Sequence, residues 1–222
     1  MLLRFVPLFL VSLSIVATAT PQTALRTADR LAWRGNWVKA GPFYAQAEEE
    51  FNQAGDSKNA LKAKVGRLRS QMQSTLCTEL SREIDQALGN SMVITDPELK
   101  LQALAYKGEI AHQSDLWVAK EAWEEVLRLS KTTGNKAWEA RATGELGVVT
   151  YVVDGDGARA TLLIGKALFK VAETQDSWAE AIYLTHTGNA LSTIGRHEVA
   201  LKYFEKALTA TGFSLSPWCL YW

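Results

Sequence analysis

The stretch RHEVALKYFEKAL, residues 196–208, carries the pattern that decides the fold. Its Ala200, Phe204 and Ala207 are spaced by four and three residues, so the three side chains share one face of an α-helix. Two small residues around a large one allow a helix to approach its neighbour closely around a single bulky side chain. The stretch therefore predicts an amphipathic packing helix.

The same small–large–small pattern recurs at intervals of about forty residues. Stepping back from Ala207, the corresponding positions are 40, 41, 39 and 40 residues apart, and the columns through Ala200 and Phe204 keep that spacing. The three columns are Ala40, Leu80, Ala119, Ala160 and Ala200; Tyr44, Ile84, Trp123, Ile164 and Phe204; and Ala47, Ala87, Val126, Ala167 and Ala207. Ordinary amphipathic packing would not repeat in register, so we predict five repeated units.

A further helix is predicted before each of these, because turn and helix-start residues recur in the same register. The turns are Gly35-Asn36, Ser114-Asp115, Gly155-Asp156-Gly157 and Gly195-Arg196. Residues typical of helix N-caps recur at spacings of 40, 39 and 41, namely Asp56, Asp96, Asn135 and Asp176. The segment VVTYVV (148–153) is β-like in composition, but inside this register it is predicted to be a buried helix. The sequence therefore predicts an all-α fold.

The fifth unit resembles the tetratricopeptide repeat. Its glycines and stripe residues are spaced 7, 5, 4 and 3 apart, at Gly188, Gly195, Ala200, Phe204 and Ala207. The first unit is similar, whereas the second departs most, with Leu80 in an alanine position and no turn glycine. Units of about forty residues are longer than the 34 of the standard repeat.

This resemblance covers residues 23–212, within the region 20–212 that we assign to the repeat array. It implies about five antiparallel helix pairs stacked into a right-handed α-solenoid, with the first helix of each pair lining a concave groove. The implied function is that of an interaction scaffold, which binds a peptide or a partner protein in the groove. The positions that match the family's concave face are Arg26, Asp29, Arg69, Tyr106, Glu109, Glu145, His186 and Asn189. A clamp for a terminal carboxylate is not expected, since Thr185 occupies the position of its lysine.

Composition and motifs argue against other functions. The 24 basic and 24 acidic residues cancel, so no positive surplus indicates a nucleic-acid partner. Catalytic and phosphate-binding motifs are absent from the sequence, and we expect neither an enzyme nor a cofactor. The three histidines lack metal-ligand spacing, and DGDG (154–157) lacks the later ligands of a calcium loop. Cys77 and Cys219 are expected to be unpaired, because the repeat register separates them by three units.

The first nineteen residues have the features of a signal peptide. Arg4 precedes an uncharged apolar run, and Ala17-Thr18-Ala19 is a small-residue cleavage site. The apolar run is shorter than the roughly 20 residues that span a bilayer. We therefore expect an exported protein, periplasmic or extracellular, without a stable membrane span after cleavage. The alternative is an uncleaved N-terminal anchor.

The last ten residues, 213–222, are apolar and end in Trp218, Cys219, Leu220, Tyr221 and Trp222. A helical array normally ends in a polar cap, so this tail allows two interpretations. It can fold back as an aromatic plug over the last pair. Alternatively, the chain is the truncated N-terminal sensor or scaffold half of a larger signalling enzyme, such as a kinase, a cyclase or a caspase-like peptidase.

Overall fold

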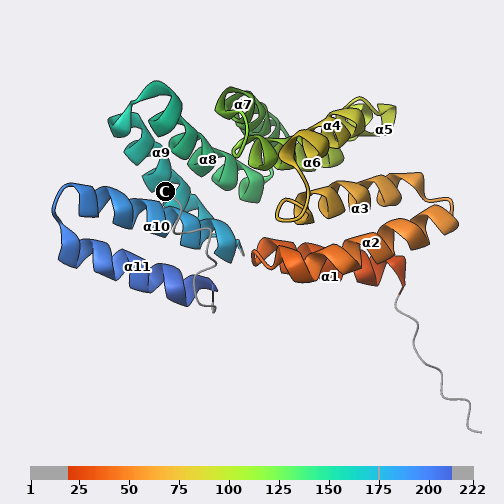
Figure 1. Ribbon diagram of the computed structural model, residues 1–222, viewed down its shortest axis with the longest axis horizontal. Helices are drawn as coiled ribbons and strands as arrows, with labels where there is room; N and C mark the ends of the chain where they lie inside the picture. The colour runs from red at the N-terminus through yellow and green to blue at the C-terminus, as the bar shows by residue number, and fades with distance from the viewer. Residues whose placement is uncertain (1–19, 175, 212–222) are drawn as a thin grey trace, which may run out of the picture.

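The computed structural model describes residues 20–174 and 176–211, and in these ranges the chain is all-helical, as the sequence predicted (Figure 1). The signal peptide, residues 1–19, and the apolar tail, residues 213–222 with Cys219, lie outside the described residues. The helices are α1 (Pro21–Trp33), α2 (Trp37–Gln53), α3 (Ser57–Ser70), α4 (Cys77–Leu88), α5 (Ser91–Thr95), α6 (Pro97–Ala111), α7 (Leu116–Thr133), α8 (Lys136–Asp154), α9 (Gly157–Val171), α10 (Ser177–Thr193) and α11 (His197–Thr211). None of the described helices is long and apolar enough to cross a bilayer.

The helices pack in adjacent pairs, and ten of them correspond to the five predicted units. The short helix α5 is additional, because it interrupts the connection between α4 and α6. It begins after Asn90, whose side chain accepts a hydrogen bond from the backbone amide of Met92. Val93 anchors it in the core. The predicted register did not include this helix.

The helix starts follow the predicted caps. The side chains of Asp56, Asp96, Asn135 and Asp176 each accept a hydrogen bond from a backbone amide in the first turn of the following helix. Asp115 and Asp156 do the same for α7 and α9. These bonds satisfy amides that an α-helix leaves unpaired at its start. The cap predictions are therefore confirmed.

The repeated columns form the packing seams between helices. Tyr44, Ile84 and Trp123 of the large-residue column are completely buried, and every alanine of the small-residue columns is buried. Glycines on the facing helices make room for the large side chains. A Cβ atom on Gly108 would lie 2.7 Å from Nε1 of Trp123, and one on Gly188 would lie 2.5 Å from the ring of Phe204. Glycine is therefore required there for close approach.

The segment 148–153 is helical, as predicted, but only its first half is buried. Val148, Val149 and Thr150 lie in the interior of α8, whereas Tyr151 is 63% exposed and Val152 is 43% exposed. Val152 follows the buried Val148 by four residues and shares its face of α8, so its exposure comes from its place in the last turn of the helix and not from a change of face. The prediction of a fully buried helix was therefore wrong for this turn.

The pairs follow one another along an arc, and α10 returns towards α1 (Figure 1). The turn between α1 and α2 meets the beginnings of α8 and α10. The rings of Trp33 and Trp138 have centroids 5.0 Å apart, and the ring of Trp178 lies against Gly35. The first pair is thus in direct contact with the fourth and fifth pairs.

Candidate functional site

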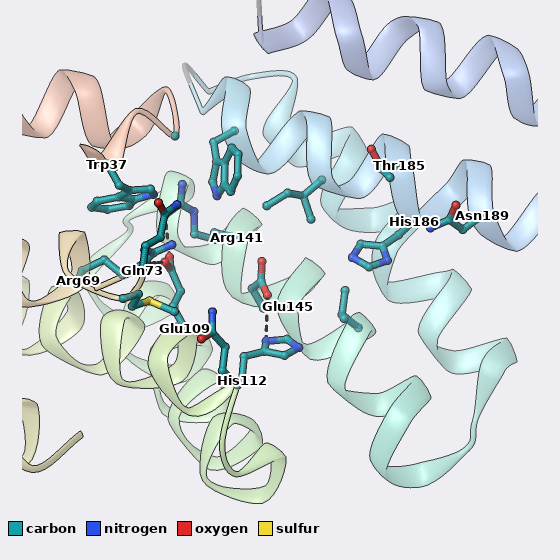
Figure 2. A pocket seen from close by; sticks show the side chains of 16 residues that line it. Trp37, Arg69, Gln73, Glu109, His112, Arg141, Glu145, Thr185, His186 and Asn189 are labelled. Carbon is teal, nitrogen blue, oxygen red and sulfur yellow. Dashed lines mark hydrogen bonds and ion pairs between the residues drawn. The ribbon is translucent and has the colours of Figure 1, made fainter. Parts of the chain in front are cut away.

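A pocket of about 430 Å³ lies on the inner side of the arc (Figure 2). Most of its lining comes from α3, α6, α8 and α10, which are the first helices of the second to fifth pairs. The rest comes from the α1–α2 turn, from Trp37 at the start of α2 and from the connections that follow α3 and α6. Pockets of 300–1,000 Å³ are typical of sites for small ligands or single side chains of a peptide. This pocket is the candidate binding site.

Five of the eight predicted groove residues line this pocket. They are Arg69, Glu109, Glu145, His186 and Asn189. Thr185, which replaces the lysine of a carboxylate clamp, also lines it, but its hydroxyl donates a hydrogen bond to the carbonyl of Ala181. The pocket therefore has no lysine at the clamp position.

The other three predicted residues lie elsewhere. Asp29 and Tyr106 border a separate hollow of about 310 Å³. Tyr106 is itself buried, and its ring packs edge-on against Trp37 and Trp138. Arg26 is exposed on α1 and lines neither hollow. The predicted set is therefore divided between the pocket, a neighbouring hollow and the surface.

A chain of ion pairs links the helices behind the pocket. Arg141 on α8 donates two hydrogen bonds of 2.8 Å to Asp176, the cap of α10, and one of 3.2 Å to Glu109 on α6. Arg69 on α3 also pairs with Glu109. Because both the guanidinium of Arg141 and the carboxylate of Asp176 are removed from water, their two-pronged contact fixes the geometry of both.

Tryptophan rings cover the two arginines. The guanidinium of Arg69 lies 4.3 Å from the centre of the Trp37 ring, and that of Arg141 lies 4.7 Å from Trp33 and 5.2 Å from Trp138. Aromatic faces attract cations at such distances. Trp33 and Trp37 flank the turn between α1 and α2, so residues beside this turn contact both Arg69 in the second pair and Arg141 in the fourth pair.

Glu145 occupies the other end of the pocket, where no arginine pairs with it in the part of the chain that the structure describes. Its Oε1 accepts a hydrogen bond of 3.2 Å from the hydroxyl of Tyr183, and its Oε2 lies 3.7 Å from Nδ1 of His112 (Figure 2). Burial, reinforced by the charge of Glu109, raises the pKa of Glu145 to about 7. This carboxyl group therefore changes charge near neutral pH.

Both pocket histidines are neutral at pH 7. Burial lowers the pKa of His112, and burial together with the neighbouring His112 lowers the pKa of His186 to about 4. Among the described residues, no three histidine, cysteine or carboxylate side chains come together in a way that could hold a metal ion. The arrangement offers neutral hydrogen-bonding groups around one titratable carboxyl group.

The prediction from the sequence did not include Arg141, Trp37 or Trp178 among the site residues, and it assigned Asp176 only the role of a helix cap. Arg141 precedes Glu145 by four residues and therefore lies on the same face of α8, which was a usable signal. Trp178 could not be placed from local patterns, because the return of α10 towards α1 brings it to the pocket.

No protein-family model matches this chain, and no curated protein is significantly similar to it.

Proposed function

We propose that this chain is a protein-binding module that holds a peptide segment of a partner protein in the pocket. The observation that carries the proposal is a pocket of about 430 Å³ whose walls come from the first helices of four successive pairs. Successive helices that share one concave surface can contact successive residues of an extended segment. The proposed role is recognition, with neither catalysis nor a cofactor.

The ion pairs support this role because they hold the pocket walls in place before a ligand arrives. Arg141 joins α8 to both α6 and the start of α10, and Arg69 joins α3 to α6. A wall that is already rigid loses little conformational entropy on binding. The same pairs neutralise the arginines, which makes the pocket a poor site for an anion.

We further propose that the helix pairs form a right-handed α-solenoid of the tetratricopeptide type, with the first helices on the concave side. Two features support this. The glycine of the first helix packs against the large side chain of the second in the third and fifth units, at Gly108–Trp123 and Gly188–Phe204. Apart from Trp37 at the start of α2, the residues that line the pocket belong to first helices and to the α1–α2, α3–α4 and α6–α7 connections.

A library of displayed random peptides, screened against the full chain, tests the binding function. Gln73 lies exposed in the turn after α3 at the edge of the pocket, so Gln73→Trp places a large ring over it. Peptides that bind the pocket should bind this variant at least about tenfold more weakly. Gln53→Trp, at an exposed position near the end of α2, is the matched control and should bind normally. Equal binding to both variants would place the peptide site elsewhere.

Export remains part of the proposal, supported by the charge and apolar pattern of residues 1–19. If the signal is cleaved after Ala19, the N-terminal residue of the mature protein is Thr20. Mass spectrometry of the protein recovered from an expressing cell tests this. A retained N-terminus in the membrane fraction would instead support the anchor.

A further inference from the structure

The fixed charges of the pocket do not balance. Its carboxylates and those bound to its arginines are Glu109, Asp176 and Glu145, against the guanidinium groups of Arg69 and Arg141. With all five ionised, three negative charges face two positive ones, which leaves one net negative charge. His112 and His186 do not supply the missing positive charge, because burial favours their neutral forms.

The excess charge is located at Glu145. Glu109 pairs with both arginines and Asp176 pairs with Arg141, whereas among the described residues the polar contacts of Glu145 are with Tyr183 and His112. The carboxyl group of Glu145 lies on the pocket side of α8 and faces the cavity between α6 and α10 (Figure 2).

The pocket walls around Glu145 suit an aliphatic chain that ends in a polar group. Val148 on the next turn of α8, Ile182 on α10 and Met72 after α3 are apolar, and Trp178 lines the side towards the α1–α2 turn. Gln113, Thr185 and Asn189 add uncharged polar groups. An alkyl chain can pack along the apolar wall and reach Glu145 with its end.

We propose that the partner segment inserts a lysine or arginine side chain into this pocket and pairs its cationic group with Glu145. This inference rests on the proposed binding function and specifies the chemistry of its ligand. One positive charge would balance the cluster, and its alkyl stem would cover Val148 and Ile182. A carboxylate ligand is disfavoured, because the two arginines already have carboxylate partners.

The titration of Glu145 supports the pairing and provides a second measurement. Below its pKa of about 7, the side chain is mostly protonated and must release that proton to pair with a cation. The groups that face it are Glu109 and His112 from α6, Arg141 from α8, and Asp176, Tyr183 and His186 from α10 and its cap. At about pH 6.5, binding should therefore release up to about 0.8 proton per ligand into the buffer.

The test compares two peptides that differ only in charge, by calorimetric titration into the full chain. One is acetyl-alanyl-arginyl-alanine amide, and its twin contains citrulline, which has nearly the same shape as arginine without the charge. We expect the arginine peptide to bind at least about tenfold more tightly and to release protons in buffers of different ionisation enthalpy. Glu145→Gln should remove both the preference and the proton release. Glu124→Gln, at an exposed position on α7, should preserve them.

Equal affinity for the two peptides, undetectable binding of both, or a preference that survives Glu145→Gln would overturn the inference. These results are distinguishable from failure of the binding function itself. Library peptides that lose affinity for the Gln73→Trp variant but contain no lysine or arginine would preserve the function and exclude a cationic ligand. Thermal melts of each variant at the titration pH confirm that it is folded.

Discussion

At the scale of single residues, the structure depends most on the buried pair between Arg141 and Asp176. The side chain of Asp176 is 0% accessible and that of Arg141 is 3% accessible. Charges so far from water are costly unless each has its partner. The pair therefore holds α8 and α10 together. Removal of one member should lower the free energy of unfolding much more than removal of both.

Arg141→Met should lower the free energy of unfolding by about 3–5 kcal/mol, because it leaves Asp176 and part of the Glu109 charge without a partner. Urea denaturation measures this loss. The double variant Arg141→Met with Asp176→Asn should recover part of it. Arg128→Met removes an arginine that pairs with Glu125 on the surface of α7, and it should leave the unfolding midpoint nearly unchanged. If Arg141→Met and Arg128→Met lowered the free energy of unfolding by similar amounts, burial of the arginine would not determine the cost of its removal.

Glu145 should make the stability of the protein depend on pH. Burial raises its pKa to about 7, above the value of about 4.5 in the unfolded chain. The folded state therefore holds this proton more tightly, so the contribution of Glu145 to stability is complete below about pH 4.5 and is lost as the pH rises through about 7. Glu145→Gln should remove this loss. Between about pH 5 and pH 8, wild type should lose up to about 3 kcal/mol relative to the variant.

His186 changes the stability with pH in the opposite direction. Comparison of wild type with the Glu145→Gln variant separates its effect from that of Glu145. Its pKa is lowered to about 4, so its contribution is present above about pH 6.5 and is lost as the pH falls through about 4. Because both proteins contain His186, its effect cancels in their difference. Denaturation curves at several pH values measure that difference, and a flat difference across this range would contradict the assignment to Glu145.

At the scale of helices, much of the structure could be predicted from short-range patterns. The stripe of Ala200, Phe204 and Ala207 repeats because each copy meets the same packing requirement, and the caps repeat because each helix start leaves the same amides unpaired. Helix α5 could not be predicted in this way. It is held by Asn90 and Val93, which have no counterpart in the other units.

Two glycine substitutions test the packing between helices. Gly108→Ala forces a methyl group against the indole of Trp123, so it should lower the free energy of unfolding by about 1–3 kcal/mol. Gly165→Ala in α9 is the matched control, since a Cβ atom there meets nothing within 4 Å. The control should stabilise the protein by about 0.5–1 kcal/mol, because alanine favours the helix. Thermal unfolding of the two variants should therefore shift in opposite directions.

At the scale of the whole molecule, prediction from the sequence was least complete. Arg69, Glu109, Glu145, His186 and Asn189 line one pocket, because one helical register places them on the same side of successive helices. Arg141 was not singled out, since its partner Asp176 lies in another unit. The contacts of Trp33 and Trp178 depend on the return of the chain, which local periodicity does not encode.

The contact between the ends of the arc can be tested with Trp33→Ala. This change removes the ring that packs on Trp138 and covers Arg141, so α1 should separate more readily from α8. We expect faster hydrogen exchange in the α1–α2 turn and a larger radius of gyration by small-angle scattering. Trp117→Ala on α7 is the control, because that ring is 64% exposed and should affect neither measurement.

The tilted contact between Trp33 and Trp138 also has an optical consequence. Two indoles with centroids 5.0 Å apart and planes inclined by 53° are close enough for their electronic transitions to couple. Such coupling produces paired bands of opposite sign in circular dichroism, which disappear when either ring moves away. The protein therefore contains its own spectroscopic reporter of whether the first and fourth helix pairs are in contact, and it requires no added label.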